Sequence, residues 1–105
     1  MTKELFDRLA NVPKELLRFA DALDANFDSF WGISNATNEL TAIINDLKAK
    51  GGVDELFLVY LIELEQSLRI SLAPIDFTLG SIYSVRRFAN RFAKILDDMR
   101  QEEGF

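Results

Sequence analysis

Apolar residues recur every three or four positions in residues 54–72, which is the spacing of one face of an α-helix. At about 100° per residue, this spacing gathers them into one narrow stripe. The stripe consists of Phe57, Leu61, Leu64, Leu68 and Leu72. We therefore expect this segment to be the helix around which the rest of the chain folds.

The first two turns of this segment are apolar on the other sides as well. The additional apolar residues are Leu56, Leu58, Val59 and Ile62. A helix that is apolar all round lies either in the centre of a core or in an interface. Burial in the core is the simpler expectation. The alternative is that these four residues form a protein interface that docks a second chain.

The N-terminal segment predicts a short helix that begins after Thr2, which can act as its N-cap. Residues 11–13 then restart the chain, because Pro13 is well suited to a first helical turn. A second helical stripe follows from Pro13 onward. Its members are Leu16, Phe19, Ala20, Leu23, Phe27 and Phe30.

A change in the direction of the apolar stripe predicts a helix break at residues 31–35. Leu16 and Leu40 belong to successive stripes that would differ by about 120° on one straight helix. Gly32 weakens a helix at this point, and Ser34 or Asn35 can cap a new one. The alternative is a single long helix over residues 13–48.

The later helix boundaries carry clear signals. Residues 48–52 place lysines and then two glycines at the end of a helix, and Asp54 suits the start of the next one. That helix must end before Pro74. Asp76 can cap the last helix, with Ser81 as a later start, and residues 101–105 are expected to fray.

Together these elements predict an all-α fold, an antiparallel four-helix bundle with a short extra N-terminal helix. Short connections between amphipathic helices favour antiparallel neighbours. The length of 105 residues and the hydrophobic content of 49% suit a single domain over residues 1–105 with a real core.

The chain contains neither cysteine nor histidine. This excludes thiol nucleophiles, redox pairs, imidazole bases and the commonest metal ligands. The remaining acids and bases are carboxylates in no catalytic pattern, and the carboxylate di-iron motif of helical bundles requires histidine. We expect no enzyme, no catalytic residue, no cofactor and no metal.

The formal net charge of −5 opposes general attraction to nucleic acid or to an anionic membrane. The longest apolar run, residues 56–62, is far shorter than the roughly 20 residues of a membrane span. The N-terminus does not have the pattern of a signal peptide. We expect a soluble, cytoplasmic protein with no membrane association; a peripheral or secreted protein is a weaker alternative.

The last helix nevertheless carries a basic stripe, since residues 78–95 contain four cations and no acid. Spacings of four and three place three of these cations on one face, opposite the apolar one, where a tyrosine borders them. A basic stripe with an aromatic residue is typical of anion or nucleic-acid binding. A solvated face with intramolecular ion pairs is the simpler interpretation. The candidate residues are Tyr83, Arg87, Arg91 and Lys94.

These observations predict a small non-enzymatic helical protein that acts by binding another protein. Inhibitors, immunity-type proteins, adaptors and small assembly subunits of bacteria or phages have this size and composition. Self-association as a two-fold homodimer is the default oligomer. The alternative function is a nucleic-acid-associated subunit that binds through the basic stripe.

Overall fold

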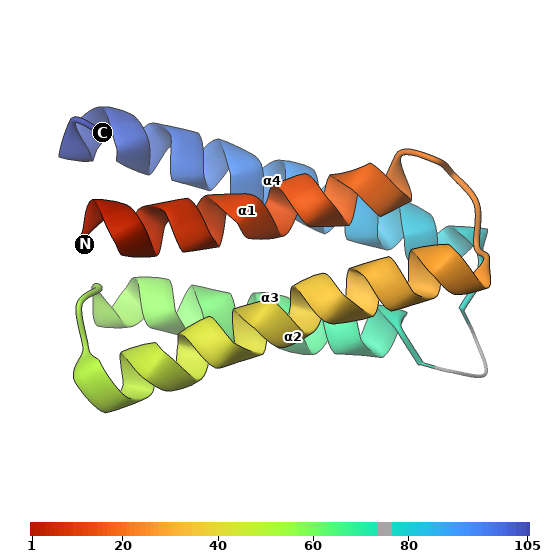
Figure 1. Cartoon of the computed structure of the whole chain (residues 1–105), viewed down its shortest axis with the longest axis horizontal. Coiled ribbons are helices and arrows are strands. Elements are labelled where there is room, and N and C mark those ends of the chain that lie inside the picture. The colour runs from red at the N-terminus through yellow and green to blue at the C-terminus, as the bar shows by residue number, and fades with distance from the viewer. Residues whose placement is uncertain (74–76) are drawn as a thin grey trace.

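The computed structural model describes residues 1–73 and 77–105, which form four helices and, within those ranges, no strand. The helices are α1 (Lys3–Ala20), α2 (Phe27–Lys50), α3 (Glu55–Ser71) and α4 (Leu79–Glu103). They run alternately up and down, so both ends of the chain lie at the same end of the molecule (Figure 1). The predicted all-α antiparallel four-helix bundle is confirmed.

The helices form a closed ring in which α1 contacts α2 and α4, and α3 contacts the same two helices. Each helix contributes to one shared hydrophobic core, whose burial supplies the main driving force for folding. The largest fully buried side chains include Leu9, Leu16, Ile33, Leu40, Leu61, Leu68, Ile82 and Phe92.

The predicted separate N-terminal helix is wrong, because α1 continues without a break through Pro13. Thr2 is its N-cap as expected, and the Thr2 hydroxyl accepts a hydrogen bond from the Leu5 N–H at 3.1 Å. Proline inside a helix costs about 3 kcal/mol. Burial of Leu9, Val12 and Leu16 on one continuous face offsets that penalty. Packing against the core therefore overrides the local signal at residues 11–13.

The first turn between helices lies at residues 21–26, so the predicted break at 31–35 and the alternative single helix over 13–48 are both wrong. Leu23 adopts a positive φ of 51° in this turn. Asn26 then caps α2, since its side-chain oxygen accepts the Ser29 N–H at 2.8 Å. The apolar periodicity does not reveal this turn, because Leu23 and Phe27 continue the stripe of α1 in the sequence although both side chains are exposed.

Gly32 lies inside α2, where it allows close approach to α1 rather than ending the helix. Gly32 is buried, and a Cβ atom at this position would lie 2.3 Å from the ring of Phe19. That distance is far shorter than any van der Waals contact, so the Phe19 ring occupies the space that another side chain would fill. The glycine is therefore required by packing between α1 and α2.

The other boundaries largely follow the sequence. Gly51, with a φ of 73°, ends α2, and the Asp54 carboxylate caps α3 by accepting the Leu56 N–H at 3.0 Å. Helix α3 ends at Ser71, before Pro74. The predicted cap Asp76 lies outside the described residues.

Both ends of α4 differ from the prediction. The helix begins directly after its N-cap Thr78, whose N–H donates to the Ser81 hydroxyl, instead of starting at Ser81. The C-terminus does not fray, because α4 reaches Glu103 and the ring of Phe105 packs against Phe6 with centroids 5.4 Å apart.

Gly32→Ala is expected to destabilise the protein by about 1 kcal/mol. Overpacking against Phe19 costs about 2 kcal/mol, which exceeds the gain of about 1 kcal/mol from replacing glycine in a helix. Urea unfolding measures the difference. Gly80→Ala is the matched control, because among the described residues a Cβ there meets only the Thr78 hydroxyl, at 3.4 Å. A Gly32→Ala protein as stable as the wild type would contradict the packing role of this glycine.

Candidate functional site

Helix α3 has the stripe that the sequence predicts, but it is not the centre of the fold. Leu61, Leu64, Leu68 and Leu72 are buried, and Phe57 is partly buried against them. The helix occupies one corner of the ring between α2 and α4, so it presents an outer face to solvent. The expectation of a helix buried on every side is therefore wrong.

The outer face of α3 keeps large apolar side chains in water. Leu56 is 77% exposed, Val59 is 46% exposed, and Ile70 near the other end of the helix is 77% exposed. The exposed polar residues Glu63 and Gln66 lie between them on the same face. The apolar part of the outer face is thus concentrated at the start of the helix.

The four predicted interface residues of α3 fall into two pairs. Leu56 and Val59 are exposed on the outer face. Leu58 and Ile62 are partly buried and pack against the core. Their spacing from Arg69 places them on the same face as that residue, whose hydrogen bonds to Asn38 and Thr41 show that this face meets α2. Only the first pair is freely available to a partner.

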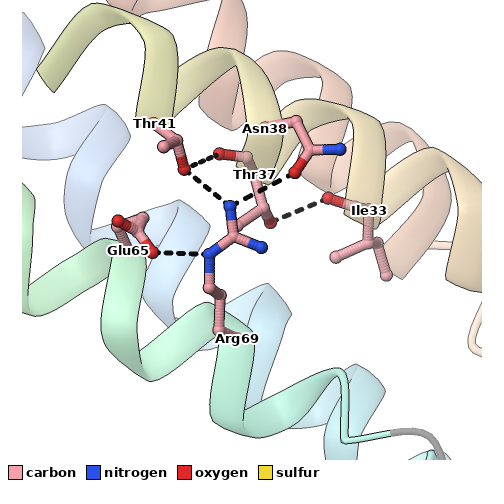
Figure 2. A network of polar contacts seen from close by, with 6 residues as sticks. All are labelled: Ile33, Thr37, Asn38, Thr41, Glu65 and Arg69. Carbon is pink, nitrogen blue, oxygen red and sulfur yellow. Dashed lines mark hydrogen bonds and ion pairs between the residues drawn. The ribbon is translucent and has the colours of Figure 1, made fainter. Parts of the chain in front are cut away.

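A polar network fixes α3 against α2 (Figure 2). The guanidinium of Arg69 donates to the Thr41 hydroxyl at 2.7 Å and to the Asn38 side-chain oxygen at 3.2 Å. Its Nε lies 2.6 Å from a carboxylate oxygen of Glu65, one turn earlier on α3. Thr41 in turn donates to the backbone carbonyl of Thr37 at 3.1 Å. These bonds hold the flank of α3 that carries Arg69 against α2.

Arg69→Ala is expected to lower the free energy of unfolding by about 1 kcal/mol, since it removes three partly exposed hydrogen bonds, two of them to neutral partners on α2. The midpoint of thermal unfolding should fall by about 4–8 °C for a chain of this size. Arg18→Ala is the control, because the contacts that Arg18 makes with described residues stay within its own helix: a 3.6 Å exposed pair with Glu15 and a cation–π contact with the Phe19 ring, 5.4 Å from its centroid. Equal melting temperatures for the two variants would contradict a role for Arg69 in holding α3.

A groove of about 770 Å³ lies between the start of α3 and the end of α4. We call it the α3–α4 groove. Its apolar lining includes Phe57 and Tyr60 of α3 and Ile95 and Met99 of α4, and Leu56 stands at its edge on the outer face. The rings of Phe57 and Tyr60 stack with centroids 6.3 Å apart. The exposed apolar residues of α3 thus continue into a hollow instead of ending at a flat surface.

Tyr60 lies at the inner part of the groove, where its ring also contacts Phe92 of the core at 6.0 Å between centroids. Burial raises the pKa of the Tyr60 hydroxyl above its ordinary value of 10.0, and the positive charge of Arg91 opposes this effect. Tyr60 therefore stays neutral at physiological pH. A smaller cleft of about 120 Å³ continues past Tyr60 between Leu64, Phe88 and Arg91.

Carboxylates and no lysine or arginine line the α3–α4 groove. The carboxylates belong to Asp54, Glu102 and Glu103, and the amine of Met1 is the one cationic group in the lining. None of the three forms an ion pair with residues 1–73 or 77–105, although Asp54 accepts one backbone hydrogen bond. The groove therefore combines an apolar floor with a negative rim.

The basic stripe of α4 is only partly bound to the rest of the fold. Arg86 pairs with Asp21 at the end of α1, with 3.0 Å between the charged atoms. Arg87, Arg91 and Lys94 are exposed, and none of them forms an ion pair with the described residues. Tyr83 is also exposed on this helix. Arg91 differs from the others because it lines the small cleft beside Tyr60.

Sequence reasoning missed an aromatic cluster at the start of α2. The start of α2 lies at the opposite end of the bundle from the start of α3 and the end of α4 (Figure 1). Phe27 and Trp31 are exposed on the first turns of α2 and contact each other edge to face at 5.7 Å. Phe30 contacts Trp31 and also Phe77, with centroids 5.4 Å apart in the second pair. The shifted turn at residues 21–26 exposes Phe27, so a correct helix boundary was needed to find this cluster.

The described part of the chain offers no group of three or more carboxylates placed to hold a metal ion. Every buried side-chain nitrogen and oxygen atom in it has a hydrogen-bond partner. None of the helices, as far as they are described, is long and apolar enough to cross a membrane. No protein-family model, curated protein or solved structure matches this chain.

Proposed function

We propose that this chain is a non-enzymatic protein-binding module that contacts its partner through the start of α3 and the α3–α4 groove. One observation carries the proposal: Leu56 and Val59 remain in water beside an apolar hollow. Single exposed apolar residues are common on protein surfaces, but a contiguous apolar patch with a polar rim is typical of an interaction site. Covering this patch removes apolar area from water at about 25 cal/mol per Å².

The chemistry of the groove favours binding over catalysis. The chain has no histidine or cysteine. The carboxylates of the groove lie at its exposed rim, and the chain has no imidazole or thiol to exchange a proton with a bound molecule at neutral pH. A shape suited to apolar side chains, without a reactive group, is what a small inhibitor, immunity-type protein, adaptor or assembly subunit requires. A cytoplasmic location is part of the proposal.

The double variant Leu56→Asp/Val59→Asp is expected to abolish partner binding while the bundle stays folded. Both side chains are exposed, so the added charges disrupt a complex without entering the core. The measurement is a pull-down of tagged protein from lysate after nuclease treatment, with circular dichroism to verify helicity. Proteins retained by the wild type should be lost from the double variant.

Ile70→Asp is the matched control for this experiment. Ile70 lies on the same helix and is as exposed as Leu56, but it lies at the end of α3 away from the groove. It should retain the partner. Equal retention by the double variant and by the wild type would contradict the proposed surface.

A second candidate function is nucleic-acid binding through α4. The observation that favours it is that Arg87 and Lys94 form no ion pair with described residues, whereas Arg86 is bound to Asp21. Exposed cations without intramolecular partners remain available to phosphates, and Tyr83 beside them offers a surface for base stacking. The net charge of −5 opposes this function and places it second.

The double variant Arg87→Gln/Lys94→Gln tests this second function. If α4 binds single-stranded nucleic acid, the slope of log affinity against log salt should fall by about 0.7 for each phosphate contact removed. Fluorescence anisotropy with a labelled single-stranded RNA measures it, and Lys48→Gln on α2 is the control. The absence of binding by the wild type at 50 mM salt would remove this candidate.

A further inference from the structure

The α3–α4 groove is a hollow at the least closely packed seam of the bundle. Helices α3 and α4 contact each other less extensively than α1 contacts either of its neighbours. Side chains from both helices therefore form the walls of the hollow without filling it. An added row of apolar side chains would complete the packing there, in the manner of an amphipathic helix bound in a groove.

The lining disfavours a small molecule as the occupant. Pockets for small ligands combine apolar walls with a few fixed polar groups that orient the ligand. Here the charged side chains are exposed carboxylates at the rim, and the partly buried hydroxyl of Tyr60 is a single polar group nearer the floor, too few to orient a small ligand. Selectivity in this groove must come from apolar contacts along its length and from charge at its edges.

The negative charges at the rim of the groove favour a partner that carries positive charge. Glu102 and Glu103 lie in the last turn of α4, where the partial negative charge of the helix C-terminus makes an acidic residue unfavourable. Neither has a cationic partner among the described residues. Together with Asp54 across the groove, they form a negative edge that a bound cation would neutralise on both sides.

We propose that the α3–α4 groove binds a cationic amphipathic helix of a partner protein, an inference that rests on the protein-binding function proposed above. Apolar side chains at positions i, i+3 or i+4 and i+7 of the partner contact Phe57, Tyr60, Ile95 and Met99. Lysine or arginine residues that flank them pair with the rim carboxylates. A second copy of this chain fits less well, because each copy has a net charge of −5 and would repel the other.

Two model peptides of about 18 residues, each about 27 Å long as a helix, test which sign of peptide charge the groove prefers. One is an amphipathic leucine–lysine helix, and the other has glutamate at every lysine position. A third peptide with the composition of the first and a scrambled order tests for unspecific attraction to an acidic protein. We expect the ordered cationic peptide to bind at least tenfold more tightly than either of the others, measured by fluorescence anisotropy at 150 mM salt.

The chain's two methionines locate the binding site. Met1 and Met99 both line the groove and are the only methionines in the sequence. With ¹³C-methyl labelling of methionine, the cationic peptide should shift both methyl resonances in an NMR titration. If the peptide binds and neither resonance moves, the groove is not its site and the proposal is overturned. Shifts that appear on raising the protein concentration alone would instead identify a second copy as the occupant and also overturn it.

Charge reversal distinguishes pairing of the peptide with the rim carboxylates from general attraction of the peptide to an acidic protein. Glu102→Lys/Glu103→Lys and the control Asp24→Lys/Asp28→Lys each remove two negative charges and add two positive ones, which changes the formal net charge from −5 to −1. The control acids are exposed near the opposite end of the bundle. We expect the first variant to lose about tenfold in affinity for the cationic peptide and the control to lose less than threefold. Equal losses in both variants would overturn the proposal.

Failure of this inference can be distinguished from failure of the proposed function. If the peptides do not discriminate by charge but Leu56→Asp/Val59→Asp still releases the lysate partner, the surface binds protein and only the chemistry assigned to the partner is wrong. If the double variant also retains the partner, both proposals fail.

Discussion

Burial of the leucine stripe of α3 is the interaction that closes this bundle. Leu61, Leu64 and Leu68 enter a core to which all four helices contribute, and α3 reaches that core from one corner of the ring. The stripe is narrow, so it fixes only one side of the helix. Arg69 holds a second side of the helix, because its hydrogen bonds to Thr41 and Asn38 keep that flank of α3 against α2. Once both contacts are made, Leu56 and Val59 at the start of α3 remain exposed on its outer face.

The exposed apolar surface is a direct consequence of that geometry. A four-helix ring covers two sides of each helix and leaves an outer face. Large apolar side chains are exposed on α2, α3 and α4, and those of α3 differ in their position, because Leu56 and Val59 lie at the end where the seam with α4 opens into a groove. These side chains gain little burial energy on folding because they remain largely in water, and they lower solubility. Their placement beside carboxylates that form no ion pair with the described residues is the basis of the proposed binding surface.

Much of the fold could be predicted from the sequence, because helical periodicity and capping residues are local signals. Thr2, Gly51 and Asp54 act as the caps that their positions indicate. The errors arise where tertiary packing overrides a local preference. Pro13 remains inside a helix because its neighbours are buried, and Gly32 is a site of close packing against Phe19 and does not break α2. No local signal could have revealed either contact, because the partner residues lie on another helix.

The candidate site was only partly predictable for the same reason. Periodicity shows that the start of α3 is apolar all round, but only the arrangement of α2 and α4 determines that Leu58 and Ile62 are partly covered while Leu56 and Val59 are not. The most direct test of the protein-binding role is hydrogen exchange of the chain alone and bound to its captured partner. Slower exchange confined to residues 53–63 and 91–103 is the predicted result. Slower exchange at residues 23–31, with none around the groove, would contradict it.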